Sequence, residues 1–290
     1  MRTMSDLFAN IAWKQKTGVV DRMLEAPGDL CFEPVAAGLE AEVYKIRFPS
    51  VNAVLKIWNK RSDPDVQFQH QLLQELKMKG ISVPEPYGWG LCQNSIKVLL
   101  TSDAGAPVSD IDQNQLKKIV NLLVDIHHIS FQQLDQPLRR TYDFVQYFYP
   151  EIHRFPDIRN AVNRLVRKAE IKQEKLIHGD FHLGNILNDH GEIKIIDWTN
   201  AQLGDPRYDV AWASFLIKIY IGETMYSAFQ NEYMKKNGIP ETDLVVFEAL
   251  ACLRWILLNR LTDIPKSERI IDRVNHAIRN NPELHRELVI

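Results

Sequence analysis

The sequence has few of the features that mark secreted, membrane-bound or nucleic-acid-binding proteins. Its three cysteines, Cys31, Cys92 and Cys252, are scattered and odd in number, which favours free thiols in a reducing compartment over a disulfide framework. No apolar run approaches the roughly 18 residues that a membrane span requires, and no charged-then-apolar signal pattern opens the chain. The formal net charge is only −2 and no long basic run occurs. We therefore expect a cytoplasmic protein with neither a membrane nor a nucleic-acid partner.

Size and composition allow a two-lobed globular protein. The chain of 290 residues is long enough for a substantial core, and 45% hydrophobic and 25% charged residues are ordinary contents for a soluble protein. There is no internal repeat and no low-complexity segment. These quantities leave the oligomeric state undefined, so information about function has to come from local motifs.

The strongest chemical signal lies in residues 176–197, LIHGDFHLGNILNDHGEIKIID. The pattern predicts a loop that leaves a buried run, followed by a hairpin that turns at residues 189–191. A hairpin of this length brings its two ends, Asn185 and Asp197, side by side, and Asp180 lies on the loop just before it. Two carboxylates and an amide are therefore expected to converge on one point.

This combination suits phosphoryl transfer, which needs Mg²⁺ held against the phosphates and an oriented hydroxyl nucleophile. Mg²⁺ takes few protein oxygens and keeps several waters, so Asn185 and Asp197 suffice as its protein ligands. Asp180 is then left to accept the proton of the hydroxyl. His178, Asp180 and Asn185 match the spacing H-x-D-x-x-x-x-N, which protein kinases have in their catalytic loop. Taken alone, the motif fits a polar turn between two strands equally well.

Two longer segments resemble one known family. HGDFHLGNIL and IIDWTNAQLGDPRYDVAWA are similar to the aminoglycoside phosphotransferase and choline kinase-like family, whose members have a protein kinase-like fold. The resemblance implies an α+β, two-lobed protein with ATP and Mg²⁺ as cofactors. A small antiparallel-sheet N-lobe would cover residues 1–102, including a helical preface at 1–30, and a larger, mostly helical C-lobe would cover residues 103–290. In the preface, residues 5–13 have helical spacing, which residues 19–24 can continue.

The N-lobe residues that would hold the nucleotide follow from this resemblance. Gly38 lies between two strand-like runs, where a loop covers phosphate, although a plain hairpin turn explains it as well. Lys56, in the run AVLK, resembles the lysine that pairs with the α- and β-phosphates. Gln69 replaces the family's glutamate partner of this lysine, and three interpretations stay open. Gln69 accepts a hydrogen bond from Lys56, which we favour, or Glu75 reaches the lysine in a shifted helix, or the lysine has no orienting partner.

The hinge and the catalytic loop complete the candidate site. By resemblance alone, Leu100, Ser102 and their neighbours form the hinge between the lobes, whose backbone groups would bind the adenine. His182 lies two residues after Asp180, so it either contacts phosphate or satisfies the loop backbone, and the sequence does not choose between these roles. In the next helix, Asp209 braces the catalytic loop by resemblance, or it simply complements the helix dipole.

The acceptor site is expected among the C-terminal helices. Trp212 and Trp255 offer rings that can stack on an acceptor, although tryptophan on a helix is more often a core residue. The adjacent His127 and His128 fit one core and one surface histidine better than a metal-binding pair. Six acidic residues offer negative charge for a cationic acceptor, and nearby basic residues offset much of it: Glu223, Glu232, Glu241, Asp243, Glu248 and Asp263.

The sequence thus predicts a kinase that transfers the γ-phosphoryl group of MgATP to a hydroxyl of a small-molecule acceptor. An aminoglycoside-type antibiotic is one candidate, which would make the protein a resistance enzyme, and a choline-like or sugar-like metabolite is the alternative. Residues 198–204 are too few to form the activation segment on which protein kinases bind a peptide. A nucleotide-binding module without catalysis also stays open, because of Gln69 and the loop that has Gly38 as its single glycine.

Overall fold

The computed structural model describes residues 3–35, 41–49, 51–59, 63–108, 111–262 and 266–284. Its contacts divide the chain into two compact units. Unit 1 consists of Met1–Pro107 and Leu187–Thr199, and unit 2 consists of Val108–Ile186 and Asn200–Ile290. Each unit contains two separate stretches of the chain, because the hairpin that follows the catalytic loop belongs to unit 1.

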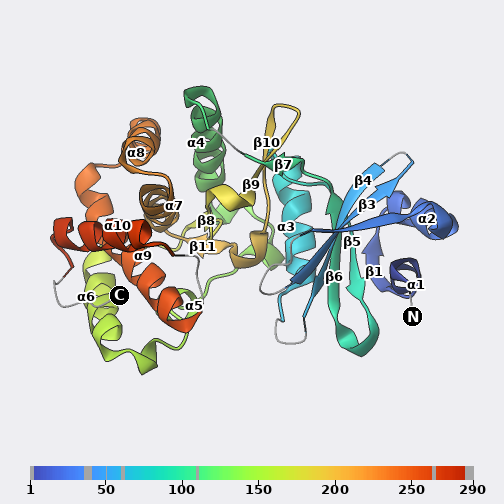
Figure 1. The fold of residues 1–290 in the computed structure, drawn as a ribbon, viewed down its shortest axis with the longest axis horizontal. Coiled ribbons are helices and arrows are strands. Elements are labelled where there is room, and N and C mark those ends of the chain that lie inside the picture. The colour runs from blue at the N-terminus through green and yellow to red at the C-terminus, as the bar shows by residue number, and fades with distance from the viewer. Residues whose placement is uncertain are drawn as a thin grey trace. The chain divides into compact units, whose positions relative to one another are not determined.

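Unit 1 is built on a six-stranded antiparallel sheet with the strand order β1-β5-β6-β4-β3-β2. Its strands are β1 Ala12–Lys16, β2 Cys31–Val35, β3 Ala41–Phe48, β4 Val51–Trp58, β5 Pro86–Leu91 and β6 Lys97–Ser102. Its helices are α1 Met4–Ala9, α2 Gly18–Glu25 and α3 Val66–Met78. Helices α1 and α2 lie on one side of the sheet and α3 lies on the other (Figure 1).

Strand β4 shows how the two faces of this sheet differ. Ala53 and Leu55 are completely buried in a cluster with residues of α1 and α2. Val54 and Lys56 line a cavity beside α3 instead. Because successive side chains of a strand point to opposite faces, one face of the sheet forms the hydrophobic core of unit 1 and the other face carries a cavity.

The predicted helical preface is confirmed in part: α1 includes residues 5–9 and α2 includes residues 19–24, but a strand separates the two helices. Helix α1 ends at Ala9, and the chain then runs as β1, which pairs with β5 before α2 begins. Gly88 and Gly90 of β5 permit this pairing, because a Cβ atom on either residue would lie 2.8 Å from a backbone oxygen of β1. The close approach of two strands decides the fold here, and helical spacing cannot reveal it.

The hairpin predicted after the catalytic loop is confirmed. The strands of this second sheet, in the order β10-β9-β7, are β7 Ala106–Pro107, β9 Ile186–Asp189 and β10 Glu192–Ile195. At its turn, His190 and Gly191 both have positive φ, and the N–H of Gly191 donates to Asn188 Oδ1 at 2.7 Å. The predicted turn chemistry of residues 189–191 therefore determines where the chain reverses.

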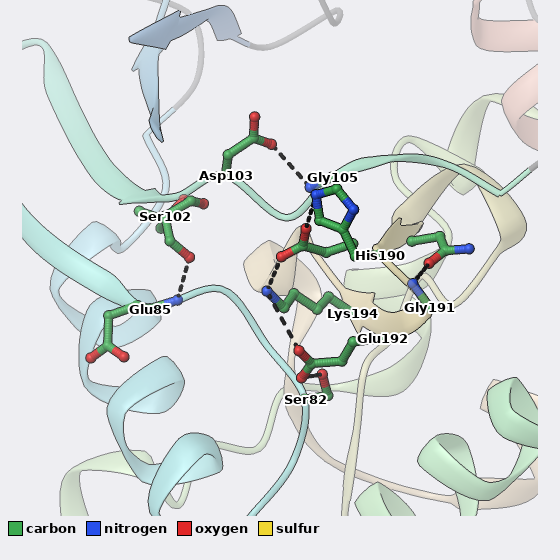
Figure 2. Close-up of polar contacts among 12 residues, drawn as sticks. Ser82, Glu85, Ser102, Asp103, Gly105, His190, Gly191, Glu192 and Lys194 are labelled. Atoms are coloured by element: carbon green, nitrogen blue, oxygen red, sulfur yellow. Dashed lines mark hydrogen bonds and ion pairs between the residues drawn. The ribbon is translucent and has the colours of Figure 1, made fainter. Parts of the chain in front are cut away.

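Polar contacts tie this hairpin to the rest of unit 1 (Figure 2). Ser82 Oγ donates to Glu192 Oε1 at 2.7 Å, and the N–H of Ile195 donates to the Ser82 carbonyl at 3.1 Å. After β6, Gly105 has a φ of +94°, and a Cβ atom there would lie 2.2 Å from the carbonyl oxygen of Asn188. A residue without a side chain is therefore required where this segment passes the hairpin.

Unit 2 is mainly helical. Its helices are α4 Gln113–His128, α5 Phe144–Phe148, α6 Pro156–Ala169, α7 Pro206–Tyr220, α8 Glu223–Asn237, α9 Glu241–Leu261 and α10 Glu268–Asn280, and its short paired strands are β8 Lys175–Ile177 and β11 Gln202–Gly204. Helices α7 and α9 are buried over most of their surface, as expected of helices that are apolar nearly all round. Among the described residues, no helix combines the length and the apolar content that crossing a membrane requires.

Candidate active site

The catalytic loop follows β8, and the start of helix α7 holds it in place. Asp209, in the first turn of α7, accepts the N–H of His178 at 2.7 Å on one carboxylate oxygen and the N–H of Gly179 at 2.9 Å on the other. Gly179 has a φ of +78°, and a Cβ atom there would lie 2.4 Å from the carbonyl oxygen of Asn200. Asp205 caps the same helix by accepting a backbone N–H. Asp209 therefore holds the loop through hydrogen bonds, in addition to any interaction with the helix dipole.

Two further residues support Asp209. His127 Nε2 lies 3.2 Å from Asp209 Oδ2, and His127 Nδ1 lies 2.6 Å from the hydroxyl oxygen of Tyr233. Because an ionised carboxylate can only accept, Nε2 carries a proton, and Nδ1 faces the Tyr233 hydroxyl. Burial by itself raises the pKa of Asp209, but the hydrogen bond from His127, the charges of His127 and His178 and the N–H of His178 outweigh burial and hold the pKa below its ordinary value. Asp209 is therefore an ionised anchor.

Two residues from distant helices orient the carboxylate of Asp180. Trp212 Nε1, on α7, donates to Asp180 Oδ1 at 2.9 Å, and Arg254 Nη2, on α9, donates to the same oxygen at 3.4 Å. Arg254 Nη1 also donates to the carbonyl of Gly179 at 2.9 Å. In the described part of the chain, no residue donates a hydrogen bond to Asp180 Oδ2, and His182 Nε2 lies 3.7 Å from it. One oxygen of the partly exposed carboxylate is fixed, and the other remains accessible.

His182 and Asn185 complete the loop. His182 Nδ1 accepts the N–H of Gly184 at 3.0 Å, which is one of its two predicted roles, and its contact with phosphate stays a prediction. Asn185 Nδ2 donates to the carbonyl oxygen of Asp180 at 3.0 Å. Since a carbonyl oxygen can only accept, the amide nitrogen must face it, and Asn185 Oδ1 is the atom that remains for a metal ion.

Unit 1 contains a cavity that is lined by its sheet, α3 and the hairpin. At this cavity Lys56 Nζ lies 3.3 Å from Asp197 Oδ2, and Thr199 Oγ1 donates to Asp197 Oδ1 at 2.8 Å. Most of the remaining lining is apolar: Val54, Leu73, Pro84, Leu99, Ala104, Leu187, Ile196 and Trp198. An apolar cavity with one ion pair in its wall suits a ligand that has both a flat ring and a charged group.

The backbone of Asp197 adopts an uncommon conformation. Its φ is 63°, a left-handed value that few residues with a side chain adopt. The next residue, Trp198, is 2% exposed, and its Nε1 donates to the carbonyl of Ile195 at 3.1 Å. A backbone of this kind persists where the surrounding structure imposes it, and such positions concentrate at functional sites. The buried Trp198 therefore helps to aim the Asp197 carboxylate toward Lys56.

The other predicted nucleotide-binding residues have different positions in unit 1. Gln69 and Ser102 line the same cavity as Lys56. The side chain of Leu100 packs into the core beside α1 and α2, so its backbone alone remains for the predicted contact. Gly38 lies outside the described residues.

Lys56 has a different partner from the one that the sequence favoured. No hydrogen bond joins Lys56 to Gln69 among the described residues, where Gln69 Nε2 is buried without a partner. Glu75 pairs with Lys79 of its own helix at 2.9 Å, so it does not reach the lysine either. The ion pair with Asp197 orients Lys56 instead, and it joins two residues that the sequence analysis assigned separately to phosphate and to metal binding.

Comparison with known proteins agrees with this geometry. A model of the phosphotransferase enzyme family matches residues 32–244, and the chain belongs to this family. The family inferred from the catalytic loop is therefore confirmed. No curated protein sequence matches the chain significantly.

Several solved structures share the fold. A thermostable mutant of aminoglycoside phosphotransferase APH(4)-Ia, in ternary complex with ADP and hygromycin B, has a TM-score of 0.67 at 17% identity, over 92% of this chain and 99% of that chain. Amicoumacin kinase hAmiN, in complex with AMP-PNP, Ca²⁺ and Ami, has a TM-score of 0.65 at 15% identity, over 89% and 90%. Choline kinase LicA from Streptococcus pneumoniae has a TM-score of 0.63 at 16% identity, over 90% and 97%. These likenesses confirm the α+β kinase-like fold, with an antiparallel-sheet lobe and a mostly helical lobe.

The sequence did not reveal the contacts of Trp212 and Arg254 with Asp180. Trp212 was expected in the core or against an acceptor; it is 4% exposed and packs in the core of unit 2, where the Arg254 guanidinium lies 4.1 Å from its ring centre. One signal could have indicated the first contact: Trp212 follows Asp209 by three residues, so both lie on the same face of α7. For Trp255, which is 1% exposed, the core interpretation is confirmed.

The histidine pair was interpreted correctly. His127 is buried and bonded inside unit 2, whereas His128 is exposed. Adjacent residues on a helix point in different directions, so the two rings have separate surroundings.

Proposed function

We propose that this protein is an ATP-dependent kinase of small molecules, which transfers the γ-phosphoryl group of ATP to a hydroxyl group of an acceptor and releases ADP. The observation that carries the proposal is the orientation of Asp180, because one carboxylate oxygen is held by Trp212 and Arg254 and the other is left for a hydroxyl. A general base must lie within hydrogen-bond reach of the proton that it accepts. Asp180 Oδ2 accepts the hydroxyl proton as the acceptor oxygen bonds to the γ-phosphorus.

The nucleotide belongs, in this proposal, to the cavity of unit 1. Its apolar walls take the adenine, with the backbone of Leu100 and Ser102 as hinge contacts, and Lys56 supplies positive charge for the α- and β-phosphates. Gly38 and Gln69 are further proposed nucleotide contacts, and His182 is a proposed phosphate contact. The ADP and AMP-PNP in two of the structurally similar kinases support this use of the fold.

Asn185 and Asp197 are the proposed protein ligands of Mg²⁺. An amide oxygen and a carboxylate are donors that this ion accepts, and the bond from Asn185 Nδ2 to the Asp180 carbonyl leaves Oδ1 for that purpose. When bound, Mg²⁺ neutralises charge on the phosphate groups. The Ca²⁺ of the amicoumacin kinase complex supports a divalent cation in this fold.

Two classes of acceptor follow from the similar proteins. Hygromycin B in one complex supports an aminoglycoside-type antibiotic, and a role in antibiotic resistance would follow from it. Choline kinase supports a metabolite alcohol instead. A protein substrate is disfavoured, because the residues between Asp197 and Asp205 form one short turn, Trp198–Asn200, and the short strand β11.

The test measures ADP release from MgATP by the purified protein with aminoglycosides, macrolides, amino alcohols and sugars as acceptors. We expect at least one acceptor to stimulate ADP release well above the background without acceptor. Asp180→Asn should lower kcat by about 10³-fold and leave ATP affinity nearly unchanged, because general-base removal affects the chemical step. Asp189→Asn is the matched control, since Asp189 pairs with Lys194 at the hairpin turn.

Three other results would contradict the proposal. Undiminished turnover by Asp180→Asn would remove Asp180 as the base. Incorporation of labelled γ-phosphate into added proteins, and not into small molecules, would indicate a protein kinase. Mg²⁺-dependent ATP binding without turnover for any acceptor would favour a nucleotide-binding module.

A further inference from the structure

Arg254 is a buried cation next to the candidate base. The residue is 7% exposed, and its guanidinium lies 4.1 Å from the ring centre of Trp212 and 5.0 Å from that of Phe148. A buried charge is costly unless it is paired and hydrogen-bonded. Among the described residues, its carboxylate partner within ion-pair distance is Asp180, and the carbonyl of Gly179 takes another of its N–H groups.

This arrangement fixes the direction of the Asp180 carboxylate. Oδ1 receives two N–H donors, so rotation of the side chain would cost Trp212 this hydrogen bond and Arg254 its carboxylate partner. The positive charge of Arg254 also opposes the attraction that the carboxylate would exert on a cation. Because Arg254 is shielded from water, solvent and salt screen this charge weakly.

Of the six acidic residues proposed to attract a cationic acceptor, two lie in ion pairs with lysines. Glu223 lies 3.4 Å from Lys218, and Glu232 lies 3.7 Å from Lys236. Glu248 accepts hydrogen bonds from the Tyr226 hydroxyl and from Gln230, and Asp263 lies outside the described residues.

We infer that Arg254 determines which acceptors the protein takes, by positioning Asp180 and by excluding positive charge from the neighbourhood of the reacting hydroxyl. The acceptor is a neutral or anionic hydroxyl compound, and a polycation such as an aminoglycoside is a poor substrate. This inference rests on the proposed kinase function and narrows it to one charge class of acceptor. Arg254 acts through Asp180 and is a positioning residue, whereas Asp180 is the catalytic one.

The test compares acceptors that differ in charge and share their shape. Choline and its neutral isostere 3,3-dimethylbutan-1-ol form one pair, and glucosamine and glucose form another, with gluconate as an anionic member. The wild-type protein should have the higher kcat/KM for the neutral or anionic members. Arg254→Met should raise the ratio of cationic to neutral kcat/KM by about 10- to 100-fold, the size expected for loss of one partly screened charge.

Two variants control for this change. Arg254→Lys keeps the charge but loses the planar fork, so it should keep the acceptor preference while kcat falls. Arg260→Met removes an arginine of the same helix that pairs with Asp157. In this variant the ratio of cationic to neutral kcat/KM should stay at the wild-type value. Circular dichroism and thermal unfolding establish that each variant is folded before its kinetics are compared.

A second measurement does not depend on turnover. Arg254 and Trp212 both donate to Asp180 Oδ1, so the side-chain carboxylate ¹³C resonance of Asp180 should move in Arg254→Met but not in Arg260→Met. An unmoved resonance in Arg254→Met would overturn the positioning role. Two results would overturn the acceptor class. One is a higher kcat/KM of the wild type for the cationic compound of a pair, and the other is a ratio of cationic to neutral kcat/KM that Arg254→Met leaves unchanged. The same comparison is made with any acceptor that stimulates ADP release in the broader panel, so loss of turnover with every acceptor contradicts the kinase function, whereas a preference for a cationic acceptor contradicts only the acceptor class.

Discussion

His127 Nε2 lies 3.2 Å from Asp209 Oδ2, and this contact connects the end of helix α4 to the catalytic loop. Asp209 in turn accepts the N–H groups of His178 and Gly179, and Tyr233 bonds the far side of the His127 ring. Residues from α4, α7 and α8 therefore act together on two peptide groups of the loop. Because all of these groups are buried, the loss of one member leaves the others unsatisfied.

Asp209→Asn should weaken both folding and catalysis. An amide presents one acceptor oxygen where the carboxylate uses two, so one loop N–H loses its partner, and we expect a loss of about 3 kcal/mol in the free energy of unfolding. Urea unfolding at pH 7 measures this loss. Asp243→Asn is the control for the helix dipole, because Asp243 lies in the first turn of α9 and is exposed. An equal loss of unfolding free energy in both variants would show that Asp209 stabilises the protein through the helix dipole and not through its hydrogen bonds to the loop.

The effect of Asp209→Asn should also depend on pH. The pKa of Asp209 is lowered in the folded protein, so its contribution to stability is fully present above the unfolded value of about 3.9 and is lost as pH falls through the lower folded value. Urea unfolding should therefore show the wild type and Asp209→Asn approaching each other in stability below about pH 4. A constant difference between them over that range would contradict the ionised anchor.

His70 should make unit 1 sensitive to acid. The residue is 1% exposed, neither ring nitrogen has a partner among the described residues, and burial lowers its pKa from 6.5 to about 4. Since the folded value is depressed, the unfolded chain takes up a proton first, and stability falls as pH drops from about 6.5 to about 4. The loss should approach about 3 kcal/mol.

His70→Leu tests this expectation. The substitution should leave stability at pH 7 equal or higher, because it removes two unsatisfied polar atoms, and it should flatten the pH dependence between pH 4 and pH 6.5. Urea midpoints across this range provide the measurement. His190→Asn is the control, since the His190 side chain is completely exposed at the hairpin turn. Acid sensitivity that persists in His70→Leu would locate its source elsewhere.

Gly179→Ala should damage the catalytic loop beyond the cost of its backbone conformation. The added Cβ would lie 2.4 Å from the Asn200 carbonyl oxygen, so the loop must shift and the hydrogen bonds to Asp209 must lengthen. Gly191→Ala is the matched control, because Gly191 also has positive φ but has open space around it. Both variants should lose about 1 kcal/mol from backbone strain, and Gly179→Ala should lose more and also lose turnover. Equal stability and equal kcat in the two variants would contradict the contact.

Lys56→Met should impair the use of ATP. The substitution removes the cation that lies 3.3 Å from Asp197, and we expect kcat/KM for ATP to fall by about 10²-fold or more, because the phosphate charge loses its partner. Steady-state kinetics with varied ATP provide the measurement. Lys194→Met is the control, since Lys194 belongs to the same unit and pairs with Asp189 at the hairpin. Unchanged ATP kinetics in Lys56→Met would exclude it from the nucleotide site.

Much of the candidate site could be predicted from sequence because its signals are local. The hairpin after the catalytic loop follows from turn residues between two short apolar runs, and it forms as predicted. Asp180, Asn185 and Asp197 were recognised by their spacing, and Lys56 by its place inside an apolar strand. These assignments used local chemistry together with the resemblance to a known family, which was needed for Lys56.

The sequence by itself therefore determined the family, the fold class and the residues that carry the proposed chemistry. Tertiary structure alone decided what holds those residues: Asp197 is the partner of Lys56, and Arg254, which follows Asp180 by 74 positions, is a partner of that carboxylate. Likewise, β1 replaced part of the predicted helical preface because Gly88 and Gly90 allow a neighbouring strand to approach. Spacing records which residues share a loop or a helix face, whereas contacts between distant segments arise from packing, which leaves no pattern in a single sequence.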